Sequence, residues 1–206
     1  MKTLLQINTS LFSVEGASSK LADRYVAQWR AANPGGRVIV RDLATYPVPH
    51  LTAATFGAFA KPPAERDGAQ ALAVAYSDAL IAELAGADVV VIGLPMYNFG
   101  VPSTLKAYFD HIARAGVTFK YTERGPVGLM TGKQAVVFAT RGGRHAGQPS
   151  DTETGFVRTF LSFVGIDDVE FVFAEGLAYG AEARAESIAS AEARADALVA
   201  APRLAA

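Results

Sequence analysis

The sequence predicts an α/β fold in which a five-stranded parallel sheet carries helices on both faces. Short apolar runs alternate along the chain with longer segments of helical periodicity, which is the pattern of βαβ units. The run Val89–Ile92 is continuously apolar and β-branched, as expected for a central parallel strand that is covered on both faces. The chain has 206 residues, of which 50% are hydrophobic. This length suits one domain with a full core, so we expect residues 1–206 to form a single domain.

The expected elements follow one another along the chain. The strands are Lys2–Asn8, Arg37–Asp42, Asp88–Gly93, Lys133–Thr140 and Val169–Ala174. The helices are Ser19–Ala32, Ala69–Ala85, Ser103–Ala113, Thr152–Val164 and a last one from about Ala181. Five strands with alternating helices favour a doubly wound three-layer sandwich, and we favour the flavodoxin-like strand order 2-1-3-4-5.

Composition excludes several classes of function. The formal net charge is -1, from 19 basic and 20 acidic residues, so no basic excess points to nucleic acid. No cysteine is present, which excludes disulfides and thiolate ligands. The three histidines show no metal-ligand spacing, so no metal site is expected. No stretch approaches the ~18 apolar residues of a membrane span, and no signal-peptide pattern is present, so we expect a cytoplasmic protein without a membrane partner.

Two loops lie where this strand order places a ligand, beyond the carboxyl ends of the first and third strands. The first, Thr9–Ser18, delivers hydroxyls and Gly16 to the start of a helix, whose free amides can hold a phosphate. The alternative is that Ser18 or Ser19 only caps that helix.

The second loop, Leu94–Val101, places Met96, Tyr97 and Phe99 around Asn98. Binding a flat ring such as isoalloxazine needs an apolar edge or face together with backbone donors, and this loop offers both. The alternative is that the aromatic side chains plug the core. Their place at the end of a central strand favours the ligand-binding interpretation.

A third loop, Thr140–His145, follows the fourth strand. Its paired glycines could lay backbone amides against a ligand, and Arg141 could lie near developing negative charge. His145 could donate a proton to an acceptor or anchor a substrate. The alternative is a flexible turn with solvated charges and an exposed histidine.

Five segments closely resemble the family of FMN-dependent NADH-azoreductases, which also act as NAD(P)H:quinone oxidoreductases. They are Pro95–Phe99, Pro102–Asp110, Ala115–Glu123, Arg141–Gly143 and Phe171–Gly176. The resemblance covers essentially the whole chain. It implies a homodimer with tightly but non-covalently bound FMN at the subunit interface. It also implies ping-pong transfer of two electrons from NADH or NADPH to quinones, and to azo compounds that are cleaved to amines.

The resemblance also assigns residues. It places the flavin ring against Pro95, Met96, Tyr97, Asn98 and Phe99, with Thr140, Arg141, Gly142 and Gly143 at another edge. It places the FMN phosphate at Ser10, Gly16, Ala17 and Ser18. It assigns the substrate pocket to Phe119, Tyr121, Phe163 and Lys61, and makes His145 and Tyr121 the candidate catalytic residues.

Two departures from the family pattern affect cofactor binding. Relatives often have Ser-Gln-Ser where this chain has Gly16-Ala17-Ser18, and serine at the position of Thr140. The phosphate site is therefore expected to offer fewer side-chain donors.

Two other functions are compatible with the fold. One is a flavodoxin-type electron carrier, which would dock its partners through a strongly acidic face that the net charge of -1 does not favour. The other is a non-catalytic FMN-binding module, because a fold alone does not fix function.

Overall fold

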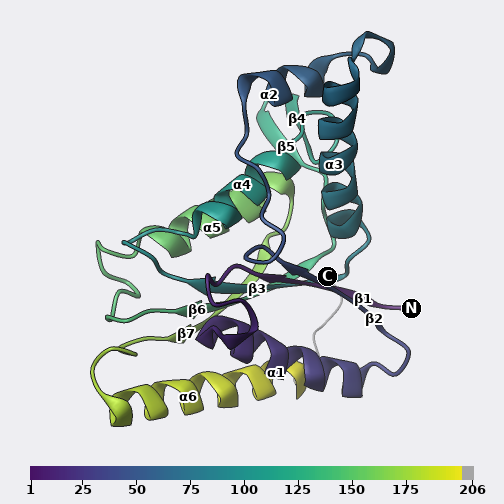
Figure 1. Cartoon of the computed structure of the whole chain (residues 1–206). Coiled ribbons are helices and arrows are strands. Elements are labelled where there is room, and N and C mark those ends of the chain that lie inside the picture. Colours follow the sequence, from purple (N-terminus) through teal and green to yellow (C-terminus); the bar gives the residue numbers. More distant parts are fainter. Residues whose placement is uncertain (201–206) are drawn as a thin grey trace.

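A five-stranded parallel sheet forms the centre of the protein, which a computed structural model describes over residues 1–200 (Figure 1). Its strand order is β2-β1-β3-β6-β7, and every neighbouring pair is parallel. The strands are β1 (Thr3–Asn8), β2 (Arg37–Asp42), β3 (Val89–Pro95), β6 (Gln134–Thr140) and β7 (Asp168–Ala174). The predicted order 2-1-3-4-5 is confirmed, because β6 and β7 are the fourth and fifth strands of this sheet.

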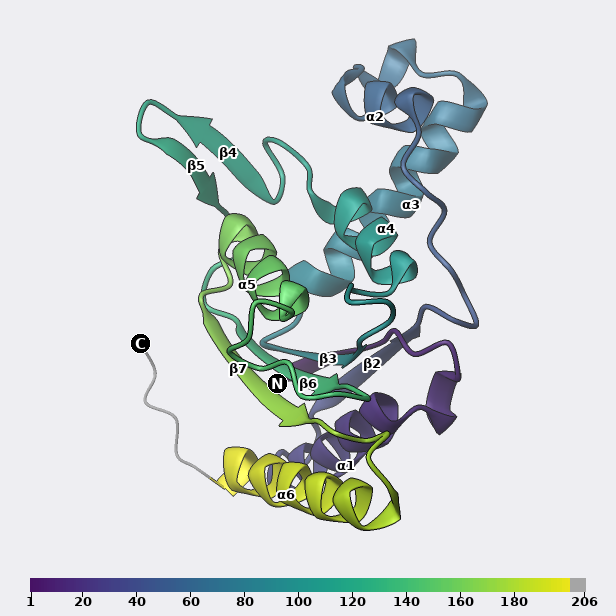
Figure 2. The same cartoon turned by 90° about the vertical axis from the view of Figure 1, so that its left-hand side faces the viewer.

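Helices cover both faces of the sheet, as predicted (Figures 1 and 2). On one face lie α1 (Ala17–Ala32) and α6 (Ala181–Ala200). On the other lie α3 (Gly68–Ala85), α4 (Ser103–Ile112) and α5 (Thr152–Val164). Each face has its own apolar cluster, so the sheet separates two cores. Burial of apolar area on both faces is the main favourable term for such a three-layer fold.

Strand β3 shows why the middle of the sheet is so apolar. All seven of its residues are buried. Gly93 near its end lets α1 approach closely, since a Cβ at this position would lie 3.2 Å from the backbone of Ser18. This close packing brings the start of α1 against the end of β3, where the first two predicted loops meet.

Two connections between the expected strands and helices contain structure that the sequence pattern did not reveal. The stretch after β2 holds α2 (Ala53–Ala60), whose first turn is capped by the side chain of Thr52, and a 3₁₀ turn, η2 (Pro63–Glu65). The stretch before β6 holds an antiparallel hairpin of β4 (Phe119–Thr122) and β5 (Gly125–Gly128). Both are short elements that depend on contacts with α3 and α5.

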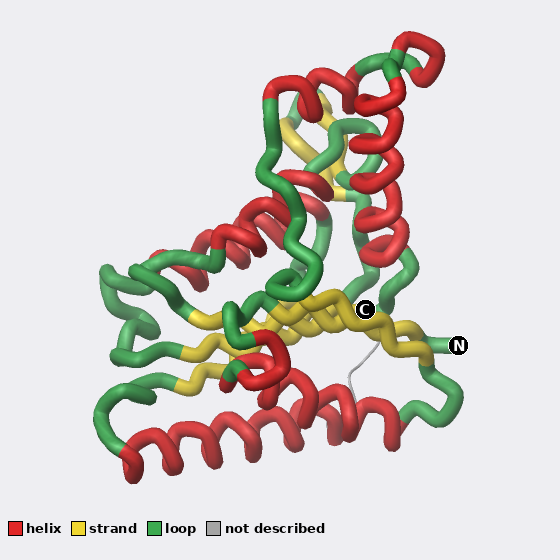
Figure 3. Tube along the Cα trace, viewed as in Figure 1, coloured by secondary structure: helices red, strands yellow, loops and turns green. Residues whose placement is uncertain are grey.

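The loops at the carboxyl ends of the strands gather along one edge of the sheet, seen at the left in Figure 3. The β4–β5 hairpin and α2 lie away from that edge, beyond the helices α3 to α5 (Figure 2). Within residues 1–200, no helix is long and apolar enough to cross a membrane.

Candidate functional site

The first loop ends in a helix start with free amides. After a 3₁₀ turn, η1 (Ser13–Glu15), helix α1 begins at Ala17, and its first internal bond runs from the Lys20 amide to the Gly16 carbonyl. The amides of residues 17–19 therefore have no partner inside the helix. No side chain caps the helix, so the simple capping role considered for Ser18 or Ser19 is wrong.

Two buried hydroxyls lie at this helix start. Ser18 and Ser19 are both fully buried, and neither hydroxyl has a hydrogen-bond partner among the described residues. Buried hydroxyls without partners are rare, because each carries an uncompensated desolvation cost. Gly16 is needed beside them, since a Cβ there would overlap the side chain of Ser10. The predicted phosphate residues thus lie together at the start of α1.

The second loop is a tight two-residue turn. The amide and carbonyl of Tyr97 exchange hydrogen bonds of 3.1 and 3.0 Å with those of Gly100. Asn98 and Phe99 lie between them with φ of 51° and 62°. Asn tolerates this left-handed conformation, but Phe pays about 1 kcal/mol for it. The turn presents Phe99 with 60% of its surface exposed, so these residues do not plug the core.

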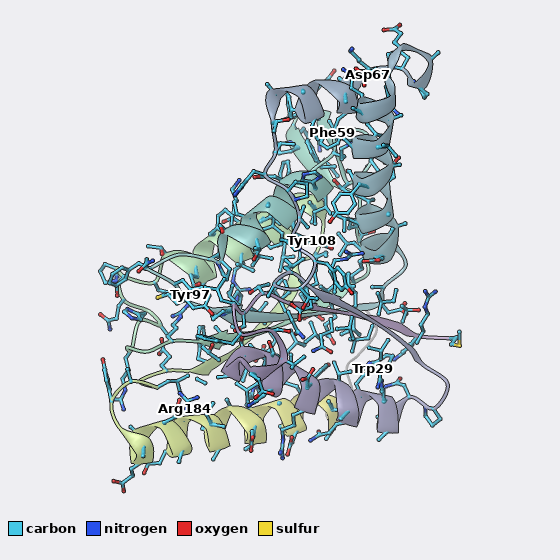
Figure 4. The ribbon with its side chains drawn as sticks, in the orientation of Figure 1. Trp29, Phe59, Asp67, Tyr97, Tyr108 and Arg184 are labelled. Atoms are coloured by element: carbon cyan, nitrogen blue, oxygen red, sulfur yellow. The ribbon has the colours of Figure 1, made fainter. Side chains whose placement is uncertain are left out.

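The turn is held from two sides. The hydroxyl of Thr152, the first residue of α5, donates a hydrogen bond to the carbonyl of Phe99. The ring of His145 meets the ring of Phe99 edge to face, with centroids 5.7 Å apart. Toward the first loop, the Tyr97 hydroxyl accepts a hydrogen bond of 3.2 Å from the Leu11 amide. Figure 4 shows Tyr97 at this edge of the molecule.

The third loop turns three carbonyl groups inward and leaves three successive amides free. The carbonyls of residues 141, 142 and 143 accept bonds from the amides of residues 177, 178 and 176, respectively. The amides of Gly142, Gly143 and Arg144 donate to no group in the described part of the chain. Gly143 lets the His145 ring lie close to the loop backbone, because a Cβ at this position would lie 2.7 Å from His145 Nε2. Successive free amides of this kind suit a carbonyl or anionic ligand atom.

The expectation that the Arg141 side chain lies beside the ligand is wrong. Its guanidinium is fully buried and forms ion pairs with Asp151 at 2.7 Å, Glu175 at 3.1 Å and Glu153 at 3.4 Å. Three carboxylates hold the guanidinium behind the loop. The Arg141 amide donates to the Ala174 carbonyl and the Arg141 carbonyl accepts from the Leu177 amide, so Arg141 leaves no free backbone donor for a ligand.

This cluster shifts the pKa values of two carboxyl groups in opposite directions. Burial raises the pKa of Glu153 to about 8, although Arg141 opposes the shift. Burial also raises the pKa of Asp151, but hydrogen bonds from Arg141 and Thr154 outweigh it and leave that pKa lowered. Asp151 is therefore the ionised partner of Arg141, and Glu153 is mostly protonated at neutral pH.

His145 is oriented by a neighbour. Its Nδ1 lies 2.9 Å from the Ser150 hydroxyl, and its backbone amide donates to Glu175 at 2.8 Å. The ring is half-buried between Phe99 and the Gly143 backbone. The structure thus brings His145 to the predicted flavin loops.

The predicted substrate residues lie elsewhere in the same chain. Phe119 packs on Phe163 with ring centroids 4.3 Å apart, and on Tyr121 at 5.4 Å. Lys61, at the end of α2, bonds to the side chain of Gln70. Phe163, on which Phe119 packs, lies at the carboxyl end of α5. Thr152, at the amino end of the same helix, contacts the Tyr97–Gly100 turn. A helix of 13 residues is about 20 Å long. Within one chain, the predicted substrate residues Phe119 and Phe163 are therefore about one helix length away from the predicted flavin loops.

An open cavity adjoins the second loop. It has a volume of about 480 Å³ and is lined by His50, Gly100, Val101, Ser103, Lys106, Thr152 and Phe156. Sequence reasoning missed five of these as site residues: His50, Ser103, Lys106, Thr152 and Phe156. Helical spacing places Lys106 on the same face as Ser103 and Phe156 on the same face as Thr152, but no sequence pattern marked Ser103 or Thr152 as a starting point. No local pattern brings His50 here. Residues 1–200 contain no cluster of three or more His, Cys, Asp or Glu that could hold a metal ion.

Fold and site together define a doubly wound α/β protein of flavodoxin-like architecture, whose candidate ligand site is formed by the loops after β1, β3 and β6. The family described by its flavodoxin-like fold matches residues 2–199, and the chain belongs to it. A protein of Cellvibrio japonicus named FMN-dependent NADH:quinone oxidoreductase is 53% identical over 192 residues, covering 93% of this chain and 96% of its own. One of the same name from Burkholderia pseudomallei is 54% identical over 191 residues, with the same coverage of 93% and 96%. The family predicted from sequence is confirmed.

Solved structures agree with this assignment. An azoreductase from Bacillus anthracis superposes with a TM-score of 0.88 at 29% identity, covering 97% of this chain and 99% of its own. An FMN-dependent NADH-azoreductase from the same species, solved in complex with FMN, has a TM-score of 0.86 at 25% identity, with coverage of 97% and 100%.

Proposed function

We propose that the protein binds FMN and transfers two electrons from NADH or NADPH to quinones. Relatives that are 53% and 54% identical carry the name FMN-dependent NADH:quinone oxidoreductase. In this chain, the proposal rests on two features that lie at the same edge of the sheet. A helix start with two buried, unpartnered hydroxyls lies near two loops that present exposed aromatic and amide groups.

The residues fit FMN part by part. The free amides at the start of α1 suit a phosphate without a lysine or arginine, and Ser10, Ser18 and Ser19 add hydroxyls. The Tyr97–Gly100 turn offers an apolar face to the ring. The amides of residues 142–144 suit the carbonyl oxygens at the polar end of the ring. Ala17 has no polar side chain, so its backbone amide is the donor that it can offer to the phosphate.

When bound, FMN supplies the two-electron chemistry that links the nicotinamide donor to the acceptor. We assign His145 the role of proton donor to the acceptor. When the Ser150 hydroxyl donates to Nδ1, the hydrogen of the neutral ring lies on Nε2 and is available for donation. Phe99 holds the imidazole by its ring edge. We further propose that donor and acceptor use the same site in turn, which is a ping-pong order, and that azo compounds are among the acceptors.

We also propose that the protein works as a homodimer with one site at each end of the interface. Phe119, Tyr121 and Phe163 lie about one helix length from the flavin loops of their own chain. Tyr121 is 74% exposed at the hairpin, where it has a free surface for a neighbour. In a two-fold dimer, the hairpin of one subunit would close the site of the other.

One preparation tests the proposal. The purified protein should be yellow and should bleach when NADH or NADPH is added without oxygen. Steady-state rates with both nicotinamides, a small quinone and a set of azo dyes then define the acceptor class. A colourless protein that takes up no FMN would contradict the flavoenzyme. A yellow protein that ignores both nicotinamides but accepts electrons from a protein donor would instead be an electron carrier.

A further inference from the structure

Arg141 joins three segments that build the site, although it touches no ligand itself. Its guanidinium contacts Asp151 and Glu153 at the start of α5, and Glu175 after β7. It also donates to the Thr154 hydroxyl at 2.9 Å. None of its side chain is exposed. Any effect on the flavin site must therefore pass through these partners.

Glu175 links the Arg141 guanidinium to the third loop. Its Oε1 accepts a hydrogen bond of 3.1 Å from Arg141 Nη1. The same oxygen accepts bonds of 2.8 and 2.9 Å from the backbone amides of His145 and Ala146. One carboxylate oxygen thus fixes the far end of the loop whose preceding amides, at Gly142 to Arg144, have no acceptor among the described residues. Charge-assisted bonds of this kind are stronger than neutral ones.

Asp151 links the Arg141 guanidinium to the second loop through the start of α5. Its side chain accepts a bond of 3.1 Å from the Thr154 amide and caps α5. The next residue, Thr152, donates to the carbonyl of Phe99 in the strained turn. Arg141 therefore lies one contact away from both the capped helix start and the end of the amide loop.

The charge of the cluster favours this arrangement. Three ionised carboxylates around one guanidinium would leave two unpaired negative charges in a buried place, which is costly. Glu153 is fully buried and neither of its oxygens accepts a hydrogen bond in the described chain. Its protonated form removes one charge and leaves Asp151 and Glu175, the two carboxylates with structural bonds, to share Arg141.

We propose that Arg141 is a positioning residue that acts through Glu175 to hold the free amides of Gly142, Gly143 and Arg144 in place for the flavin ring. The inference rests on the proposed FMN function and deepens it. Without Arg141, Glu175 loses its cation, and the amides of His145 and Ala146 lose a fixed acceptor. The loop then samples other conformations, and the ring oxygens meet fewer pre-oriented donors.

Four variants test the proposal in the full-length protein. They are Arg141→Met, Glu175→Ala, Glu175→Gln and, as a matched control, Lys133→Met. Lys133 also donates from a partly buried site, to the carbonyls of Ala85 and Ala87, but at the opposite edge of the sheet. The measurements are the Kd for FMN, the midpoint potential of bound FMN, and circular dichroism to verify the fold.

We expect Arg141→Met and Glu175→Ala to raise the Kd by about tenfold or more and to shift the potential, as loss of one charged anchor predicts. Glu175→Gln keeps an acceptor oxygen, so it should stay closer to the parent protein than Glu175→Ala. Lys133→Met should alter stability but neither FMN property. Equal Kd values for the parent and Arg141→Met would overturn the proposal. If Arg141→Met does not fold, a Kd of Glu175→Ala equal to that of the parent would overturn it.

Hydrogen exchange of the flavin-free protein gives a readout that does not depend on FMN. The amides of His145 and Ala146 should be protected in the parent protein and in Glu175→Gln, and should exchange faster in Glu175→Ala. Unchanged exchange in Glu175→Ala would refute the positioning role. A parent protein with protected amides that binds no FMN would instead refute the proposed function and leave the loop anchor standing.

Discussion

The hydroxyl of Tyr97 lies 3.4 Å from the hydroxyl of Ser10, close enough for a weak hydrogen bond between the loops after β3 and β1. The same Tyr97 oxygen accepts a bond from the amide of Leu11. Ser10 in turn fills the space beside Gly16, at the helix start. The turn proposed to bind the flavin ring and the loop proposed to bind the phosphate are therefore linked through the phenol of Tyr97.

Removing that phenol oxygen should weaken FMN binding through the phosphate loop. We expect Tyr97→Phe to raise the Kd for FMN roughly three- to tenfold, which corresponds to about one neutral hydrogen bond. Riboflavin, which lacks the phosphate, serves as the control ligand in the same fluorescence titration. Its Kd should change less. An equal loss for both ligands would show that Tyr97 acts on the ring alone.

The periodic parts of the fold were predictable because each strand is a short apolar run bounded by a helix pattern. Strand β3 is the clearest case, since its continuous burial matches its continuous apolar sequence. The β4–β5 hairpin was missed because its strands have only four residues each and three of those eight residues are Gly or Pro. β4 contains strand-favouring Phe, Tyr and Thr, but β5 is mostly Gly and Pro, and the hairpin also contacts α5.

The site was only partly predictable, for a different physical reason. The Tyr97–Phe99 loop could be located because fold logic fixes where parallel strands end. The direction of the Arg141 side chain could not, since its three carboxylate partners come from two later segments of the chain, the start of α5 and the residue after β7. A local sequence that reads as a charged, glycine-rich loop is compatible with an exposed or a buried arginine. Tertiary packing decides between them.

Because the backbone of Phe99 is strained, replacing Phe99 by glycine should raise stability and lower FMN affinity. Phe99→Gly should raise the free energy of unfolding of the flavin-free protein by about 1 kcal/mol at most, because glycine adopts a φ of 62° without strain. The same change removes the exposed ring and should lower FMN affinity. Urea unfolding and FMN titration measure the two effects.

Asn98→Gly provides the matched control for the strain. Asn98 has a similar φ of 51°, but asparagine tolerates that region, so the gain in stability should be smaller. A loss of stability in Phe99→Gly that exceeds any loss in Asn98→Gly would mean that ring contacts with His145 outweigh the strain.

The raised pKa of Glu153 predicts that its contribution to stability decreases as pH rises. Its pKa in the folded protein is about 8, raised by burial from the ordinary value of 4.5. Between these values the folded protein holds a proton that the unfolded chain releases. The contribution of Glu153 to the free energy of unfolding therefore falls as pH rises, by up to roughly 1.4 kcal/mol per pH unit.

Glu153→Gln removes this titration. The stability of the variant relative to the parent protein should rise as pH increases from about 4.5 to about 8, as judged by urea unfolding near both values. Glu192→Gln, which changes a partly exposed carboxylate on α6, is the control and should show no such trend. A constant difference between Glu153→Gln and the parent would mean that Glu153 is ionised in the folded state throughout.

The separation of hairpin and flavin loops predicts which residues affect the acceptor alone. Tyr121→Ala should raise the KM for a quinone by about tenfold, as expected for losing an aromatic contact, and leave the Kd for FMN unchanged. Tyr46→Ala removes another exposed tyrosine, on the linker after β2, and should change neither constant. If Tyr121→Ala weakens FMN binding as much as Phe99→Ala does, the division between cofactor and acceptor residues is wrong.

Mixed dimers test whether the hairpin serves its own chain or its partner. Phe99→Ala damages the flavin loop and Tyr121→Ala damages the hairpin. If each site takes its loop from one subunit and its hairpin from the other, a dimer of the two variants contains one site with both defects and one intact site. Mixing after reversible dissociation should then restore part of the quinone reductase activity. A hairpin that served its own chain would leave one defect in each site, and mixing would restore nothing.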